Sequence, residues 1–308
     1  MENSNAVGCE KIKSGNFSSD RGELMPVAAI LAAVFLWGAS FPAMRKAVGD
    51  LSPWAVMWVR MVIASVLLLP TAGKFVAGSY RKGDWKLLAA MALFQPCLYF
   101  LMESYALRFT TSSQAGIIAA SLPLMVALGA WLVLSETITR HAVAGLILSI
   151  IGVACLTLLD APGGAAENPL LGNFLELGAM ASASANFLVI KQLSRRYNPW
   201  GLTAIQMTAG VVFFIPGLFF LLHADGSVWT LQMILILIFL GGFVTVGAFG
   251  LYNWGMSRIP AARASVFINL IPVVAVALGW SLLGEGLTAF QCVAASAVIG
   301  GVWLGQRS

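Results

Sequence analysis

The stretch of sequence that decides the fold reads LPLMVALGAW at residues 122–131, and it returns as IPVVAVALGW at residues 271–280. In both copies a proline is followed eight residues later by a tryptophan, and Pro123 and Pro272 are 149 positions apart. Chance similarity between two hydrophobic segments does not keep a proline and a tryptophan in step. The chain therefore contains an internal repeat, which is the first pattern to interpret.

The repeat extends in both directions from these two segments. After the tryptophan, Glu136, Thr139 and Gly152 recur as Glu285, Thr288 and Gly301 at the same offset of 149. Before the proline, Pro53-Trp54 and Pro70 recur as Pro199-Trp200 and Pro216 at an offset of 146. A drift of three residues in one loop reconciles the two offsets.

Lipid is the expected solvent for most of the chain. Of its 308 residues, 59% are hydrophobic and 10% are charged, whereas soluble domains carry about 25% charged residues. A helix needs about 20 apolar residues to cross a bilayer. Runs of this kind predict ten spans, at residues 25–46, 53–72, 85–108, 113–135, 139–159, 170–191, 199–222, 229–257, 261–283 and 287–306. The expected fold class is an all-α integral membrane protein with ten transmembrane helices.

Each copy of the repeat holds five of the predicted spans. Because five is an odd number, the second copy is expected to enter the membrane from the opposite face, which gives two inverted five-helix repeats. Halves related in this way can exchange conformations, and the exchange converts a cavity open to one side into a cavity open to the other. The alternative is a duplication that only enlarges the helix bundle.

Lys and Arg side chains indicate the orientation in the membrane. Fourteen of them fall on one side of the predicted spans and three on the other, with Arg60 inside a span. Basic residues favour the cytoplasmic side, so both termini are expected there, in the inner (plasma) membrane. Residues 1–24 are predicted to form a disordered cytoplasmic tail, residues 25–160 the first repeat and residues 170–306 the second. We therefore interpret the net charge of +5 as a result of the basic residues that set the membrane orientation, and not as a sign of nucleic-acid binding.

The sequence resembles the drug/metabolite transporter superfamily, specifically its EamA branch, over about residues 25–306. The marks are Trp37-Gly38-Ala39-Ser40-Phe41-Pro42 in the first span, Pro123 with Ser135-Glu136 and Thr139, and Pro272 with Gly284-Glu285 and Thr288. It departs from the family pattern at Ser135, where Gly is usual, and at Ala183, where Trp is expected. The resemblance implies a ten-helix bundle with a central substrate cavity, alternating access, and export of amino acids or other metabolites.

Three charged side chains, Arg60, Glu103 and Glu176, fall inside predicted spans, where an unpaired charge costs several kcal/mol. All three are expected in the outer third of the membrane, at depths that allow pairing. One hypothesis is that Glu103 or Glu176 titrates as a proton-coupling site or binds the amino group of a substrate, while Arg60 sets its pKa or meets a substrate carboxylate. The alternative is a fixed salt bridge. Their equivalents in the other copy are Gln206, Tyr252 and Ile30, so the charges have no counterpart.

Polar and aromatic residues midway along the spans are the candidate substrate-binding groups: Trp37, Ser40, Gln95, Tyr99, Asn186, Tyr252 and Asn269. An amide side chain in hydrocarbon needs a hydrogen-bonding partner, so these groups predict a polar cavity that could bind a small zwitterion. Helix breaks are expected at Pro96, Pro123 and Pro272, where freed backbone carbonyls serve as ligands or the helices simply bend. Helix-to-helix packing is the alternative role for each polar residue.

An enzyme is not expected, and neither is a cofactor or metal. His141 and His223 lie near span ends, and the sequence shows no metal-ligand spacing, nucleophile elbow or phosphate-binding glycine loop. The predicted function is a secondary transporter that exports an amino acid or related neutral or zwitterionic metabolite. The alternatives are efflux of drugs or lipophilic cations, and a facilitative, uncoupled carrier. The expected partners are a small-molecule substrate, the lipid bilayer and protons as a candidate coupling ion, without nucleic acid, in a monomer or homodimer.

Overall fold

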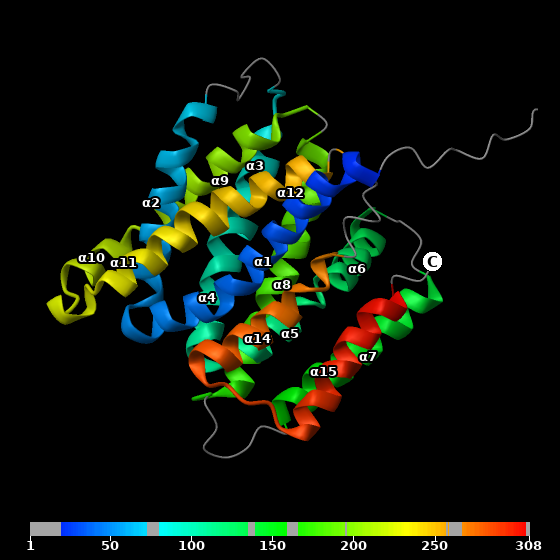
Figure 1. The fold of residues 1–308 in the computed structure, drawn as a ribbon. Coiled ribbons are helices and arrows are strands. Elements are labelled where there is room, and N and C mark those ends of the chain that lie inside the picture. Colours follow the sequence, from blue (N-terminus) through cyan, green and yellow to red (C-terminus); the bar gives the residue numbers. More distant parts are fainter. Residues whose placement is uncertain are drawn as a thin grey trace, which may run out of the picture.

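The computed structural model describes residues 20–72, 80–134, 139–158, 166–194, 196–256, 258 and 267–305. Within these ranges the regular structure is helical throughout (Figure 1), which confirms the all-α fold class. Most of the predicted N-terminal tail lies outside the described residues, as do Ser135 and Glu136 of the repeated motif and residues 261–266 of the ninth predicted span. The first helix begins at Asp20 rather than at residue 25.

The helices of the two copies follow one another along the chain. The first copy contains α1 (Asp20–Asp50), α2 (Pro53–Ala72), α3 (Asp84–Ala92), η2 (Leu93–Leu98), α4 (Tyr99–Phe109), α5 (Ser112–Ala119), α6 (Leu122–Leu134) and α7 (Arg140–Leu158). The second contains α8 (Pro169–Leu193), α9 (Pro199–Phe213), α10 (Pro216–Leu222), η3 (Gly226–Val228), α11 (Leu231–Ile238), η4 (Phe239–Ala248), α12 (Phe249–Met256), α14 (Ile271–Leu283) and α15 (Ala289–Gly305).

Length and composition mark most of these helices as membrane-spanning. Six helical runs in the described chain are long and apolar enough to cross a bilayer, and α9 with α10 forms a seventh that bends by 59°. The helices α7, α14 and α15 contain shorter apolar runs. Large apolar side chains such as Phe174, Leu222 and Trp280 are exposed on the outside of the bundle. A soluble monomer rarely leaves so much apolar surface exposed, so lipid is the surrounding medium.

Two helical runs are interrupted by π-helical turns at equivalent places in the two copies. The segment η2 separates α3 from α4, and η4 separates α11 from α12. Moving residues 93–98 by the repeat offset of 149 gives residues 242–247, which lie inside η4. In η2 the backbone of Gln95 is not helical, with φ −146° and ψ 123°, before a cis peptide bond to Pro96. Such turns free backbone carbonyls for other partners and are frequent at functional sites.

Contacts between helices are related by exchange of the two copies. Two pairs join equivalent helices, namely α7 with α15 and α2 with α9. Other contacts occur twice, since α4 packs on α8 as α12 packs on α1, and α6 packs on α8 as α14 packs on α1. The two copies are therefore interleaved rather than placed side by side as separate domains. Between them lies an apolar core that includes the fully buried Met57, Met61 and Phe214.

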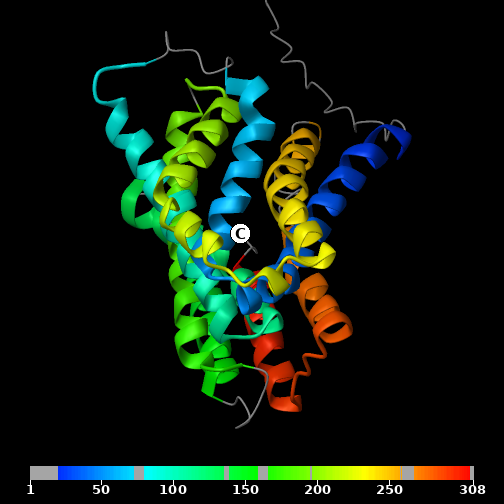
Figure 2. The ribbon, with the colours of Figure 1, turned by 90° about the vertical axis from the view of Figure 1, so that its left-hand side faces the viewer.

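Glycines allow the backbones of α7 and α15 to touch, and these helices lie side by side in both views (Figures 1 and 2). A Cβ atom on Gly301 would lie 2.5 Å from the carbonyl oxygen of Gly145 and 2.8 Å from the backbone nitrogen of Ser149. The Ser149 hydroxyl donates a 3.2 Å hydrogen bond to the carbonyl of Val298. Small residues at helix contacts are the usual way in which helices associate in lipid. The span-ten glycine Gly301 thus packs within one chain.

Replacing Gly301 with alanine is expected to destabilise the protein by about 1–3 kcal/mol, the usual cost of overpacking a contact that cannot relax. The matched control is Gly300→Ala, because a Cβ at Gly300 meets nothing within 4 Å. The midpoint of thermal unfolding in detergent micelles measures both. Equal midpoints for the two variants would contradict the close α7–α15 contact.

Candidate functional site

Three amide side chains close around the interruption at Gln95. The side-chain nitrogen of Gln206, on α9, donates to the backbone carbonyl of Gln95 at 2.8 Å and to Oδ1 of Asn186 at 3.0 Å. Asn186, on α8, donates in turn to Oε1 of Gln95 at 2.8 Å. The non-helical backbone of Gln95 leaves its carbonyl available for this contact. We call Gln95, Asn186 and Gln206 the amide triad.

Arg60 makes the corresponding contact with the other π-helical segment. Its Nε donates a 2.9 Å hydrogen bond to the hydroxyl of Thr245 in η4, and that hydroxyl donates to the carbonyl of Leu240 at 2.8 Å. The guanidinium carbon lies 4.4 Å from the centre of the Phe100 ring, a cation–π contact. Arg60 and Gln206 are repeat equivalents, and each reaches from one copy into the interrupted helix of the other.

The predicted charged residues divide into a bonded pair and a separate carboxyl group. Arg60 Nη1 lies 3.9 Å from Oε2 of Glu103, and the Tyr99 hydroxyl donates a hydrogen bond to Oε1 of Glu103. Glu176 is fully buried on α8, and neither of its oxygens has a hydrogen-bonding partner among the described residues. The structure thus brings Arg60, Tyr99 and Glu103 together and leaves the Glu176 carboxyl group without a hydrogen-bonding partner among the residues that it describes.

The remaining predicted residues lie at other helix contacts. The Trp37 ring meets the Tyr252 ring with centroids 5.1 Å apart, across the contact between α1 and α12. The Ser40 hydroxyl donates to the carbonyl of Trp37 in its own helix at 2.6 Å. Asn269 lies in the turn before α14. These groups do not belong to the amide triad.

The two other predicted helix breaks occupy equivalent positions. Pro123 and Pro272 lie in the first turns of α6 and α14. Proline is tolerated there because a first-turn N–H group has no partner within its helix. Pro123 thus directly follows the interruption between α5 and α6, and Pro272 directly follows the turn before α14.

Glu285 forms a second buried cluster that the sequence did not predict as a site. We call the end of the bundle where α1 meets α2 the α1–α2 end; Figure 2 shows these helices diverging from it. There, Glu285 accepts hydrogen bonds of 2.8–2.9 Å from the backbone and hydroxyl groups of Ser112 and Ser113, and pairs with Nε of Arg45 at 3.1 Å. A carboxylate is favourable at a helix N-terminus because the first N–H groups are otherwise unpaired. Glu285 thereby ties α5, α1 and the α14–α15 turn together.

Two glycines permit this position of Glu285. Gly284 caps α14 in the left-handed region, at φ 67°, and turns the chain back toward α5. A Cβ on Gly279 would lie 2.5 Å from Oε2 of Glu285 and 2.7 Å from the hydroxyl of Ser113. Gly-Glu in the motif therefore has a local physical role, whereas the sequence identified Glu285 only as a repeated residue.

The opposite end of the bundle carries a different tie. Arg196, in the α8–α9 turn, donates two hydrogen bonds of 2.9 Å to the buried carboxylate of Asp84, and the Tyr197 hydroxyl donates a third at 2.7 Å. Hydrogen bonding to Asp84 raises the pKa of Arg196, and burial followed by the contact with Asp84 raises the pKa of Tyr197. Both donors keep their protons at neutral pH, so this tie between α3 and the α8–α9 turn holds over the physiological range.

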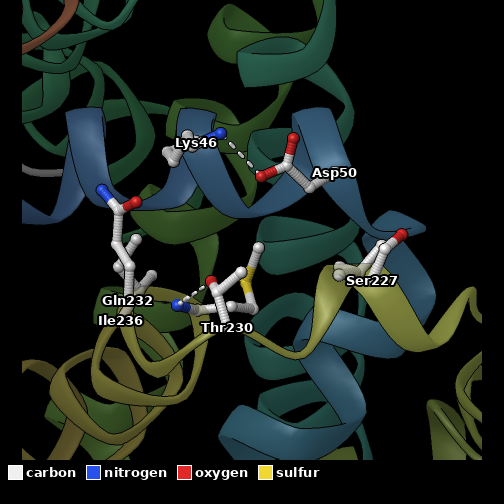
Figure 3. A pocket seen from close by; sticks show the side chains of 8 residues that line it. Lys46, Asp50, Ser227, Thr230, Gln232 and Ile236 are labelled. Carbon is white, nitrogen blue, oxygen red and sulfur yellow. Dashed lines mark hydrogen bonds and ion pairs between the residues drawn. The ribbon is translucent and has the colours of Figure 1, made fainter.

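A cavity of about 330 Å³ opens at the α1–α2 end, as Figure 3 shows. Its lining residues are Lys46, Asp50, Ser227, Val228, Thr230, Gln232, Met233 and Ile236. Lys46 and Asp50 pair at 2.7 Å, with side chains about two-fifths exposed. Such an exposed ion pair contributes little to the stability of the folded protein. None of the predicted substrate-binding residues lines this cavity, so it is distinct from the polar interior.

Comparison with known proteins identifies the family. The model of the EamA-like transporter family matches residues 24–158 and again residues 170–305. The "Uncharacterized transporter YetK" of Bacillus subtilis is 26% identical over 280 residues, which cover 90% of this chain and 85% of that protein. A "Probable terminal-alkyne amino-acid exporter" of Streptantibioticus cattleyicolor is 25% identical over 91% of this chain and 93% of its own length. A solved structure titled "Crystal structure of protein" shares the fold, with a TM-score of 0.58 and 18% identity, covering 92% of this chain and 95% of that one.

Glu285→Gln is expected to lower the free energy of unfolding by about 1.5–3 kcal/mol, because hydrogen bonds to a charged group are lost and Arg45 loses its counter-charge. Asp225→Asn is the control, since Asp225 is exposed in the loop before η3. Thermal unfolding in detergent micelles measures the difference. If Glu285→Gln unfolds at the temperature of the Asp225 variant, the proposed tie at the α1–α2 end is wrong.

Proposed function

Because the chain belongs to the EamA-like transporter family of the drug/metabolite transporter superfamily, we propose that it exports a small metabolite from the cytoplasm by alternating access. The family is one of transporters and not of enzymes, and the chain is a multi-pass membrane protein. The observation that carries the proposal is the amide triad, which places neutral hydrogen-bonding groups at a helix interruption between the two copies. Alternating-access carriers bind substrates at interrupted helices between repeats.

The proposal includes ten spans arranged as two inverted five-helix repeats. The helices α7, α14 and α15 complete the set when each is taken as one span with its flanking residues. The exchange-related contacts and the equivalent π-helical segments support two copies related by a two-fold axis. The two family matches support a division into repeats at residues 25–160 and 170–306. Because α1 begins at Asp20, residues 20–24 are not part of the predicted disordered tail.

We place both termini in the cytoplasm and the protein in the inner (plasma) membrane. The distribution of Lys and Arg, fourteen against three, supports this orientation. The Glu285 cluster then lies at the outer face, and the Asp84–Arg196 tie lies at the inner face. In this arrangement Glu285 closes the outer side by holding α1 and α5 together, and alternating access requires that contact to open.

An amino acid or related neutral or zwitterionic solute fits the interior best. The amide triad offers both donors and acceptors without net charge, and the name of the Streptantibioticus cattleyicolor relative supports the same class of solute. Efflux of lipophilic cations is the second candidate, favoured by the buried carboxyl groups of Glu103 and Glu176. Each solute class has its own probe in the test below.

Counterflow in proteoliposomes tests this function. Vesicles loaded with unlabelled amino acids are expected to accumulate radiolabelled amino acids transiently and saturably, whereas vesicles without protein do not. Gln206→Leu removes the donor shared by Asn186 and the Gln95 carbonyl, so the rate should fall roughly tenfold, about 1.4 kcal/mol in barrier. Gln232→Leu, at the exposed cavity, should retain the rate. Counterflow of tetraphenylphosphonium without amino-acid counterflow would replace the proposal with cation efflux.

Cysteine labelling tests the orientation, in a background whose four native cysteines are replaced by serine. Ser227→Cys, in the exposed segment η3, is expected to react with an impermeant maleimide in intact cells. Ser194→Cys, exposed at the end of α8, should react only in inverted vesicles. The reverse pattern would place the termini outside.

A further inference from the structure

The carboxyl group of Glu176 is enclosed by the contact between α8 and α4. Its exposed fraction is 0%, and neither oxygen has a hydrogen-bonding partner in the described part of the chain. On either side of it along α8, Gly172 and Gly178 let α4 approach closely. A Cβ on Gly172 would lie 2.7 Å from the backbone nitrogen of Thr110, and one on Gly178 would lie 2.9 Å from the sulfur of Met102. Both water and lipid are therefore excluded from Glu176.

No described side chain is placed to neutralise Glu176. From α4, Glu103 acts on it as a like charge and is itself bonded to Tyr99 and paired with Arg60. The other titratable or charged groups described on helices packed against α8 are Asp84, which binds Arg196, the buried thiol Cys97, the partly buried Tyr105 and Cys155, and the exposed Lys86, Arg108, Arg140 and His141. The helix α5 contributes Gln114, which accepts from Asn173, and α6 contributes no charge in its described residues.

An ionised carboxylate in this enclosure has a prohibitive energy, because burial without a partner costs many kcal/mol and the nearby Glu103 carboxylate adds repulsion. The neutral form requires only one proton on one oxygen. We propose that Glu176 binds the coupling proton of the transport cycle, while Glu103 is fixed as the partner of Arg60. Binding converts the carboxylate to the acid, and opening of the α4–α8 contact to water returns the proton, with no other bond changed.

The repeat equivalent of Glu176 argues against a purely structural role. That equivalent is Ile30, which is also fully buried and packs with Val34 and Tyr252. In the first copy the position is therefore occupied by an apolar side chain in the corresponding contact, between α1 and α12. Since the architecture accommodates isoleucine there, it does not need a carboxyl group, and a buried carboxyl group is a costly substitute that needs a function.

Infrared spectroscopy of the purified protein, in micelles of a detergent that has no carbonyl group, tests the proton site without any substrate. Exposed carboxyl groups ionise near their ordinary pKa of about 4, so only an enclosed acid keeps a carboxylic-acid C=O stretching band at about pH 8. The wild type is expected to show this band and Glu176→Gln to lose it. Glu167→Gln, at an exposed residue, is the matched control and should keep it. A wild type without the band, or a band lost in Glu103→Gln but kept in Glu176→Gln, overturns the proposal.

Transport tests the coupling, which rests on the proposed function. With radiolabelled amino acids as the probe, a pH gradient should drive accumulation by the wild type. Glu176→Gln should lose this accumulation while saturable counterflow remains measurable. Glu176→Asp, which keeps an ionisable group, should restore part of the accumulation. If a sodium gradient drives accumulation by the wild type, or if a pH gradient does not, the coupling role of Glu176 is wrong. Saturable counterflow in the same vesicles would still support the proposed transport function. Absence of amino-acid counterflow in the wild type removes the proposed amino-acid substrate, and the infrared band still decides the proton site.

Discussion

A polar atom in the hydrocarbon core has no water to bind, so it must find a partner within the protein. This constraint accounts for the most unusual contacts of the interior. Where α-helical hydrogen bonding lapses at Gln95, the side chain of Gln206 takes up the free carbonyl. In η4, Thr245 bonds the carbonyl of Leu240 and is itself bonded by Arg60. Each interrupted helix is thus held by a side chain from the other copy.

The same contacts show where the duplication has diverged. The two positions that reach into the interrupted helices carry Gln206 in one copy and Arg60 in the other, so one interruption is neutral and the other is charged. The charged Arg60 pairs with Glu103, and the Tyr99 hydroxyl donates a hydrogen bond to the same carboxylate. A symmetric backbone therefore supports two different chemistries, and the difference comes from side chains rather than from the arrangement of helices.

The periphery of the bundle is held by other means. The helices α7 and α15 meet through glycines whose backbones touch, an arrangement with no room for a side chain. A carboxylate ties each end of the bundle. Glu285 accepts hydrogen bonds from the N-terminus of α5, and Asp84 accepts hydrogen bonds from Arg196. A rigid contact at α7 and α15 and ionic ties at the ends suit a protein in which the ties exchange while the glycine contact persists.

Apolar run length was enough to predict an all-helical membrane protein, because helix formation in lipid depends on the local composition of the chain. The repeated residues indicated the duplication that the two family matches support. Candidate groups such as Gln95, Asn186 and Arg60 also followed, since polar residues are rare in such runs. Which of these groups pair with one another did not follow from the sequence. Asn186 binds a residue 91 positions away and Arg60 one 185 positions away. These helices are apolar on nearly every side, so hydropathy does not specify their rotation, and only tertiary packing decides which polar atoms meet.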